Sequence, residues 1–175
     1  MRLLTYYFFI LLLTGCGQFD SNKSQVYESK GYFYDTSIIV ILPLTENLNQ
    51  FDKKCKEVML NREDIKNIDS LLIKCISDYN VNSEKDFERI NSQRPELKIE
   101  KSNFIIDLKK YKRQYLAVLN PKGEKEVWIN CGCDFSGENW KYSIIYVEDG
   151  GNCYFNLKIN LTKKVFYDLM VNGVA

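Results

Sequence analysis

The chain has 175 residues, of which 45% are hydrophobic, 14% are aromatic and three are proline. This composition is typical of one compact domain and argues against a fibre or a largely disordered chain. The formal net charge is +1. Because a nearly neutral chain has little electrostatic attraction to a phosphate backbone, we expect no nucleic acid among its partners.

A short apolar run opens the chain. Arg2 is followed by apolar sequence from Leu3 to Leu13, which has the length of an export signal and is too short for a membrane-spanning helix of about 20 residues. The run ends in Leu13-Thr14-Gly15-Cys16, which resembles the lipobox of bacterial lipoproteins. In such proteins the small residues before the cysteine fit the signal peptidase, and the cysteine thiol receives a diacylglyceryl group.

The lipobox implies three segments: a signal peptide at residues 1–15, a lipid anchor with a polar tether at 16–35, and a single globular domain at 36–175. Two or three acyl chains on Cys16, palmitate for example, would hold the domain at a membrane without spanning it. In lipoproteins of this kind Gly17, rather than an aspartate, favours the outer membrane of the cell envelope. An ordinary cleaved signal or a buried apolar segment is the alternative, and a short strand over residues 32–34 competes with the tether.

The first half of the domain combines a strand with helices. The β-branched run at residues 37–42 predicts a strand that ends at the following proline. A helix is predicted after Asn61, whose side chain can cap it, with Asp64 at the third position. A second, shorter helix is predicted from Ser83 and must end before Pro95. Apolar residues recur at helical spacing on the first helix: Ile65, Ile68, Leu71, Leu72, Cys75, Ile76 and Tyr79.

The second half changes to the alternation that is typical of strands. A hairpin is predicted around the turn at residues 120–123, and another strand over residues 143–148. The glycines of Asp149-Gly150-Gly151 favour a tight turn before the next strand. The inward residues of that strand are Cys153, Phe155, Leu157 and Ile159, and those of a last strand are Val165, Tyr167, Leu169 and Val171.

Helices followed by a meander of about four strands predict an α+β domain, in which the amphipathic helix covers one face of an antiparallel sheet. A cystatin-like or NTF2-like curved sheet around a helix satisfies this pattern. These are analogies of fold and say little about function.

Three stretches of the chain are YKRQYLAVLNPKGEKEVWINCGC, DGGNCYFNLKINL and the terminal VNGVA. Together they resemble a pattern found in small uncharacterised lipoproteins of the Bacteroidota. The resemblance covers roughly residues 57–175 and includes the helical segment DIKNIDSLLIKCISDYN. It supports the lipoprotein assignment and implies no reaction, because no activity is assigned to that group.

Six cysteines are the most chemically suggestive residues. Lipidation of Cys16 would leave five, so at least one thiol stays unpaired within the monomer. The envelope permits disulfides, and we expect Cys131 to pair with Cys153, because both lie on the inward side of neighbouring strands. Cys75 falls on the apolar face of the helix and is expected to be a small buried hydrophobe.

Catalytic and metal chemistry find little support in the sequence. A thiol-redox centre at Cys131-Gly132-Cys133 is an alternative, although the familiar dithiol centre has two intervening residues and a helix N-terminus. The chain has no histidine, which removes Ser-His-Asp and Cys-His catalysis and the usual zinc ligands. No glycine-rich phosphate loop is present. We therefore expect no enzyme, no metal and no cofactor.

The aromatic residues favour binding instead. Five aromatic residues alternate with the inward residues and would therefore project from the outer face of the sheet: Trp128, Trp140, Tyr142, Tyr146 and Tyr154. Such side chains bind sugars or proteins, although a second layer that covers them is equally compatible. We expect a non-enzymatic, membrane-anchored binding or interaction module, such as an inhibitor or immunity-type protein, whose partner is an envelope protein or a glycan. A structural envelope component without a dedicated ligand is the remaining alternative.

Overall fold

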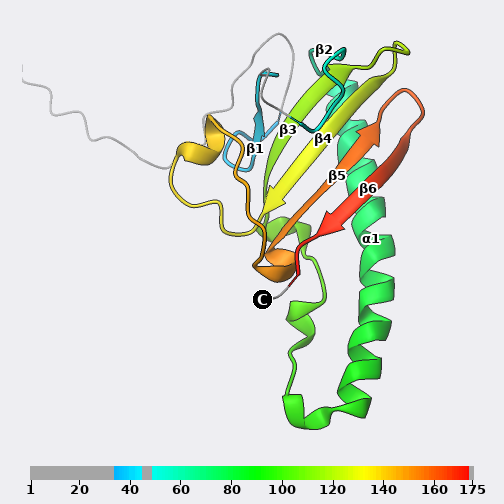
Figure 1. Ribbon diagram of the computed structural model, residues 1–175, viewed down its shortest axis with the longest axis vertical. Coiled ribbons are helices and arrows are strands. Elements are labelled where there is room, and N and C mark those ends of the chain that lie inside the picture. Colours follow the sequence, from blue (N-terminus) through cyan, green and yellow to red (C-terminus); the bar gives the residue numbers. More distant parts are fainter. Residues whose placement is uncertain (1–33, 45–48, 174–175) are drawn as a thin grey trace, which may run out of the picture.

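The structure is a computed structural model that describes residues 34–44 and 49–173. One long helix packs against a mixed six-stranded sheet, so the domain is α+β as predicted (Figure 1). The lipobox, Cys16 and nearly all of the predicted tether lie outside the described residues. Within the described ranges, no helix has the length and apolar character needed to cross a membrane.

Helix α1 runs from Arg62 to Gln93 and begins as predicted. The Asn61 side chain accepts a hydrogen bond from the Asp64 amide at 2.9 Å, and Asp64 accepts one from the Asn61 amide at 2.8 Å, which closes a capping box. The prediction of a second helix from Ser83 is wrong, because Ser83 is buried inside the same continuous helix. No proline or glycine interrupts the chain before Pro95, so the first helix continues.

The sheet has the order β1-β3-β4-β5-β6, and β2 pairs separately with β3. Strands β3 to β6 form an antiparallel meander, whereas β1 pairs with β3 in parallel. Helix α1 lies between β1 and β3 in the chain and supplies the crossover that parallel strands require. The strands are β1 (Ile39–Ile41), β2 (Lys56–Glu57), β3 (Lys112–Leu119), β4 (Lys125–Gly132), β5 (Tyr154–Asn160) and β6 (Val165–Val171).

Two details of the predicted strands are wrong. Residues 143–148 form no strand and belong to the long connection between β4 and β5. In β6 a bulge interrupts the pairing with β5, and Asp168 within it has a positive φ of 53°. Because the extra residue shifts the alternation, Phe166 packs against the core together with Leu169 and Val171, in place of the predicted Val165 and Tyr167.

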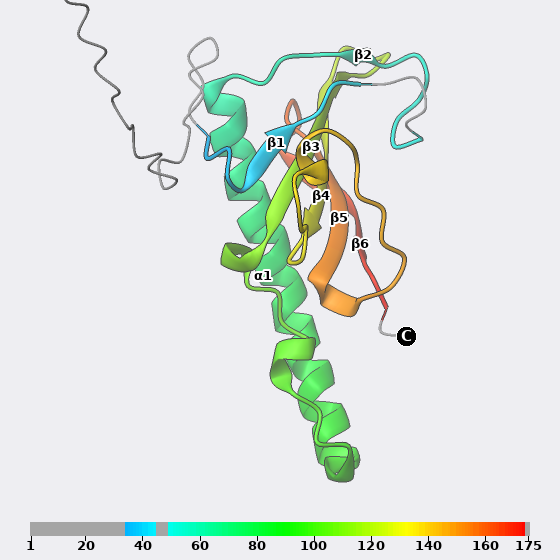
Figure 2. The ribbon, with the colours of Figure 1, turned by 90° about the vertical axis from the view of Figure 1, so that its left-hand side faces the viewer.

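The two faces of the sheet are covered differently. On the inner face, the apolar residues of α1 pack against the inward side chains of β3, β4 and β5 to form the main core. The outer face, opposite α1, carries a smaller cluster of Leu42, Leu116 and Trp128. Figure 2 shows α1 on one side of the sheet and the β4–β5 loop, residues 133–153, on the other. Ile144 of this loop, together with Leu42 and Phe51, covers part of the outer face, and a hollow remains over β4 to β6.

Candidate ligand-binding pocket

The two tryptophans do not form a free surface, and of the two sequence alternatives the structure has the second layer that covers them. Trp128 on β4 is 5% exposed and Trp140 in the β4–β5 loop is 1% exposed. The loop folds back on the sheet as a second layer and buries the Trp140 ring, over which Lys112 Nζ lies 5.2 Å from the centroid. Tyr154 is half-buried beside the ring of Phe135, at a centroid distance of 6.1 Å.

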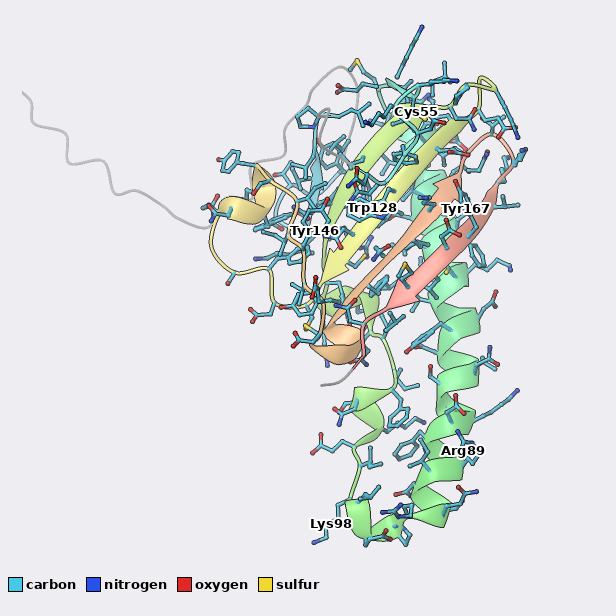
Figure 3. The ribbon with its side chains drawn as sticks, viewed as in Figure 1. Cys55, Arg89, Lys98, Trp128, Tyr146 and Tyr167 are labelled. Carbon is cyan, nitrogen blue, oxygen red and sulfur yellow. A yellow bond between two sulfur atoms is a disulfide. The ribbon has the colours of Figure 1, made fainter. Side chains whose placement is uncertain are left out.

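Two other predicted aromatic residues remain exposed. Tyr142 is 76% exposed and Tyr146 is 65% exposed, and both lie on the β4–β5 loop. Figure 3 shows Tyr146 on the same side of the sheet as Trp128 and Tyr167. Tyr146 is fixed by Gln50, whose Nε2 donates a hydrogen bond to the phenol oxygen at 2.7 Å. An exposed aromatic ring that is held in one orientation is well suited to contact a ligand.

Gln114 on β3 attaches the loop to the sheet. Its side chain is fully buried and makes four hydrogen bonds. Nε2 donates to the carbonyl oxygens of Trp140 at 2.6 Å and Ser143 at 2.7 Å, and Oε1 accepts from the Ile145 amide and from Asn130 Nδ2, both at 3.0 Å. These bonds occupy backbone groups of residues 143–145 that would otherwise form hydrogen bonds with a neighbouring strand. This explains why the segment is irregular.

A disulfide closes the base of the same loop, but it is not the predicted one. Cys153 is bonded to Cys133 rather than to Cys131, with a Cα–Cα distance of 5.0 Å. Cys131 lies opposite Phe155 in the β4–β5 register, and Cys133 follows two residues later, where its amide donates to the Cys153 carbonyl at 2.9 Å. Cys153 therefore meets the residue directly opposite, whereas Cys131 points into the core.

The free thiols of the core are poorly suited to redox chemistry. Cys131 is fully buried, and burial raises the pKa of its thiol to about 12. Burial likewise raises the pKa of Cys75 to about 11, and this residue lies in the core as expected. Because the thiolate is the reactive form, both groups are held in the unreactive protonated state at neutral pH. The structure does not bring Cys131 and Cys133 together as a dithiol pair, since Cys133 is bonded elsewhere.

A pocket of about 390 Å³ lies on the outer face over β4, β5 and β6, and we call it the outer-face pocket. Tyr146 from the loop and Trp128 from β4 contribute its aromatic lining. Its polar lining comprises Asn49, Gln50, Asn130, Asn156, Lys158, Asp168 and Asn172. Of the predicted surface residues, Trp128 is thus brought to the pocket, whereas Trp140 and Tyr154 are not part of its lining.

The ionisable groups of the pocket neutralise each other. Lys158 Nζ lies 3.3 Å from Asp168 Oδ2, and it also lies over the rings of Phe51 and Tyr167 at 5.8 and 5.9 Å from their centroids. The lysine charge is therefore balanced by one carboxylate and placed against two aromatic faces. The pocket has polar groups without a net charge.

A larger groove, of about 900 Å³, lies between α1 and residues 101–109. Its floor is apolar, and Ile73 and Val81 contribute to it. Four of the charged residues in its lining form ion pairs, Lys101 with Glu84 and Arg113 with Asp69. Ligand sites combine an apolar or aromatic lining with a few polar groups held in fixed orientations. The outer-face pocket is the better candidate, because it brings two aromatic rings together with several hydrogen-bonded amide side chains.

Sequence reasoning missed the asparagines of the pocket, although their signal was present. Asn156 and Lys158 alternate with the inward residues of β5 and are therefore outward-facing. Asn130 lies on β4 and Asn172 directly follows β6, so only the tertiary fold brings them to the same pocket. In the part of the chain that the structure describes, no three His, Cys, Asp or Glu side chains gather as a metal site. In comparisons with known proteins, no family model, no curated protein and no solved structure matches the chain.

Proposed function

We propose that the protein is a lipid-anchored, non-enzymatic binding module of the cell envelope, and that the outer-face pocket is its ligand site. The lipobox at Cys16 supports the anchor, and Gly17 supports an outer-membrane location. Its partner is an envelope glycan or protein. As a finer proposal, the helix on its curved sheet is a cystatin-like or NTF2-like arrangement to which β1 is added in parallel.

One observation carries the binding proposal: the pocket collects amide groups whose hydrogen-bonding capacity is only partly used. Asn130, Asn156 and Asn172 each make hydrogen bonds that fix the side chain while leaving one amide atom unpaired. Binding sites preserve such pre-oriented polar groups, because a ligand that pairs with them replaces water at little entropic cost. The Lys158–Asp168 pair and the lack of histidine in the chain favour binding over acid–base catalysis.

The anchor and the pocket are tested separately. Metabolic labelling with an alkyne analogue of palmitate is expected to mark the wild-type chain and not the Cys16→Ser variant. If wild-type Cys16 is unlabelled, the anchor and the envelope location both fail.

Capture of partners from detergent extracts tests the pocket. Tyr146→Ala is expected to lose the partners that the wild type retains, because Tyr146 lines the pocket. Tyr142→Ala is the matched control, since Tyr142 is also an exposed tyrosine of the same loop but lies outside the pocket lining. Equal capture by both variants would remove the pocket from the proposed function.

A further inference from the structure

We propose that the outer-face pocket binds an uncharged, hydroxyl-rich ligand of the size of a monosaccharide or disaccharide. This inference rests on the proposed function and specifies its ligand class. It follows from the orientation of the three asparagine amides, from the charge of the pocket, and from its volume and aromatic rim.

The amide orientations of two asparagines are fixed by carbonyl acceptors. Asn130 Nδ2 donates to the Ile145 carbonyl at 2.8 Å, and Asn172 Nδ2 donates to the carbonyls of Val147 at 2.6 Å and Asp149 at 2.9 Å. Only the nitrogen of an amide side chain can donate a hydrogen bond to a carbonyl oxygen, so the oxygen and nitrogen positions of these two side chains cannot be exchanged. The Oδ1 atoms of both residues have no protein donor within the described ranges, and neither is among the atoms sealed from solvent.

Asn156 has the opposite orientation. Its Oδ1 accepts a hydrogen bond from Trp128 Nε1 at 3.3 Å, because the indole can only donate. The Nδ2 group of Asn156 has no protein acceptor in the part of the chain that is described. These three asparagines therefore offer two amide acceptors and one amide donor, and the exposed Asn49 adds a fourth asparagine amide to the lining. A hydroxyl group can donate and accept at once, so a molecule with several hydroxyls satisfies this mixture.

The charge of the pocket disfavours ionic ligands. The Lys158 ammonium and the Asp168 carboxylate are 3.3 Å apart and cancel, which leaves no net field to attract a phosphate, a carboxylate or an ammonium group. A charged ligand could pair with Lys158 or Asp168 only by displacing the other residue of the pair. An uncharged ligand can instead hydrogen-bond to the edge of the pair without breaking it.

Size and shape agree with a small saccharide. The volume of about 390 Å³ lies toward the small end of the range of roughly 300–1,000 Å³ for ligand pockets. Tyr146 at the rim is 65% exposed and is oriented by Gln50, so its ring can cover the C–H face of a sugar whose hydroxyls meet the amides.

The test uses the full chain in a detergent without a sugar headgroup, so that the detergent does not compete. An array of neutral oligosaccharides with terminal glucose, galactose, mannose or N-acetylglucosamine is probed, together with sialylated and uronic-acid glycans. Binding to a neutral class is expected. Asn156→Asp is expected to weaken it about tenfold or more, since this change keeps the acceptor for Trp128 but replaces the free donor by a negatively charged acceptor. Tyr142→Ala is expected to bind as the wild type does, and thermal unfolding confirms that each variant is folded.

Each outcome decides the proposal. Neutral-glycan binding that is lost in Asn156→Asp and Tyr146→Ala supports it. A preference for the acidic glycans, or neutral-glycan binding unchanged by both substitutions, would overturn it. If no glycan binds while the extracts still give a protein partner that depends on Tyr146, the ligand class is wrong and the proposed binding function stands. If neither is found, both fail.

Discussion

Replacement of Gln114 by leucine tests whether one buried amide holds the β4–β5 loop on the sheet. The variant preserves approximate side-chain volume but removes all four hydrogen bonds, which join Gln114 to Trp140, Ser143, Ile145 and Asn130. At a net value of about 1 kcal/mol per bond, the free energy of unfolding should fall by about 4 kcal/mol. For a chain of this size, that corresponds to a decrease in Tm of roughly 8–16 °C.

Chemical denaturation measures the loss directly, and the same substitution at an exposed site is the control. Gln93→Leu at the exposed end of α1 should change the free energy of unfolding by no more than about 0.5 kcal/mol. Gln114→Leu should also abolish ligand capture, because Tyr146 is on the detached loop. A loss below about 1 kcal/mol for Gln114→Leu would refute the reasoning, since it would mean that the loop is held by something other than these bonds.

Three further predictions concern the cysteines and one acidic residue. Replacing both Cys133 and Cys153 by serine opens a loop with a sequence separation of 20 and should cost about 3 kcal/mol in denaturant titrations; an unchanged midpoint would contradict this. Hydrogen bonds from Lys163 and then Asn160 lower the pKa of Glu124 to about 2, so the free energy of unfolding should fall as the pH decreases from 4.5 toward 2. Glu124→Gln should flatten this part of the pH profile, and an identical slope in both proteins would count against the assignment. The buried thiol of Cys131 should resist alkylation in the native protein and react after denaturation, and rapid native labelling detected by mass spectrometry would show that it is accessible.

Local features of the fold could be predicted from the sequence. The capping box at Asn61 and the apolar face of α1 depend on residues three or four positions apart, and the turn before β4 depends on neighbouring residues. The parallel pairing of β1 could not be predicted in the same way, because it is set by the path of the intervening chain. Residues 143–148 alternate like a strand, but side chains from β3 and β4 take their backbone groups.

The candidate site was less predictable than the fold. Alternation correctly placed Trp128 on the outer face, but its burial depends on a loop that is attached by a glutamine distant in the sequence. The disulfide was assigned to the wrong partner because alternation placed Cys131 on the same face as Cys153 without giving the register. A shift of two residues in the β4–β5 register would keep the same face and exchange the cysteine opposite Cys153, and only the paired strands determine this register.

The bulge at Asp168 affects more than the packing of β6. β6 is an outer strand of the described sheet, and the other border is formed by β1 with three residues and β2 with two. A strand from another molecule can be added only along a continuous row of unpaired amides and carbonyls, and neither border provides a long one. Short or interrupted borders of this kind disfavour fibril-like association between copies of the domain.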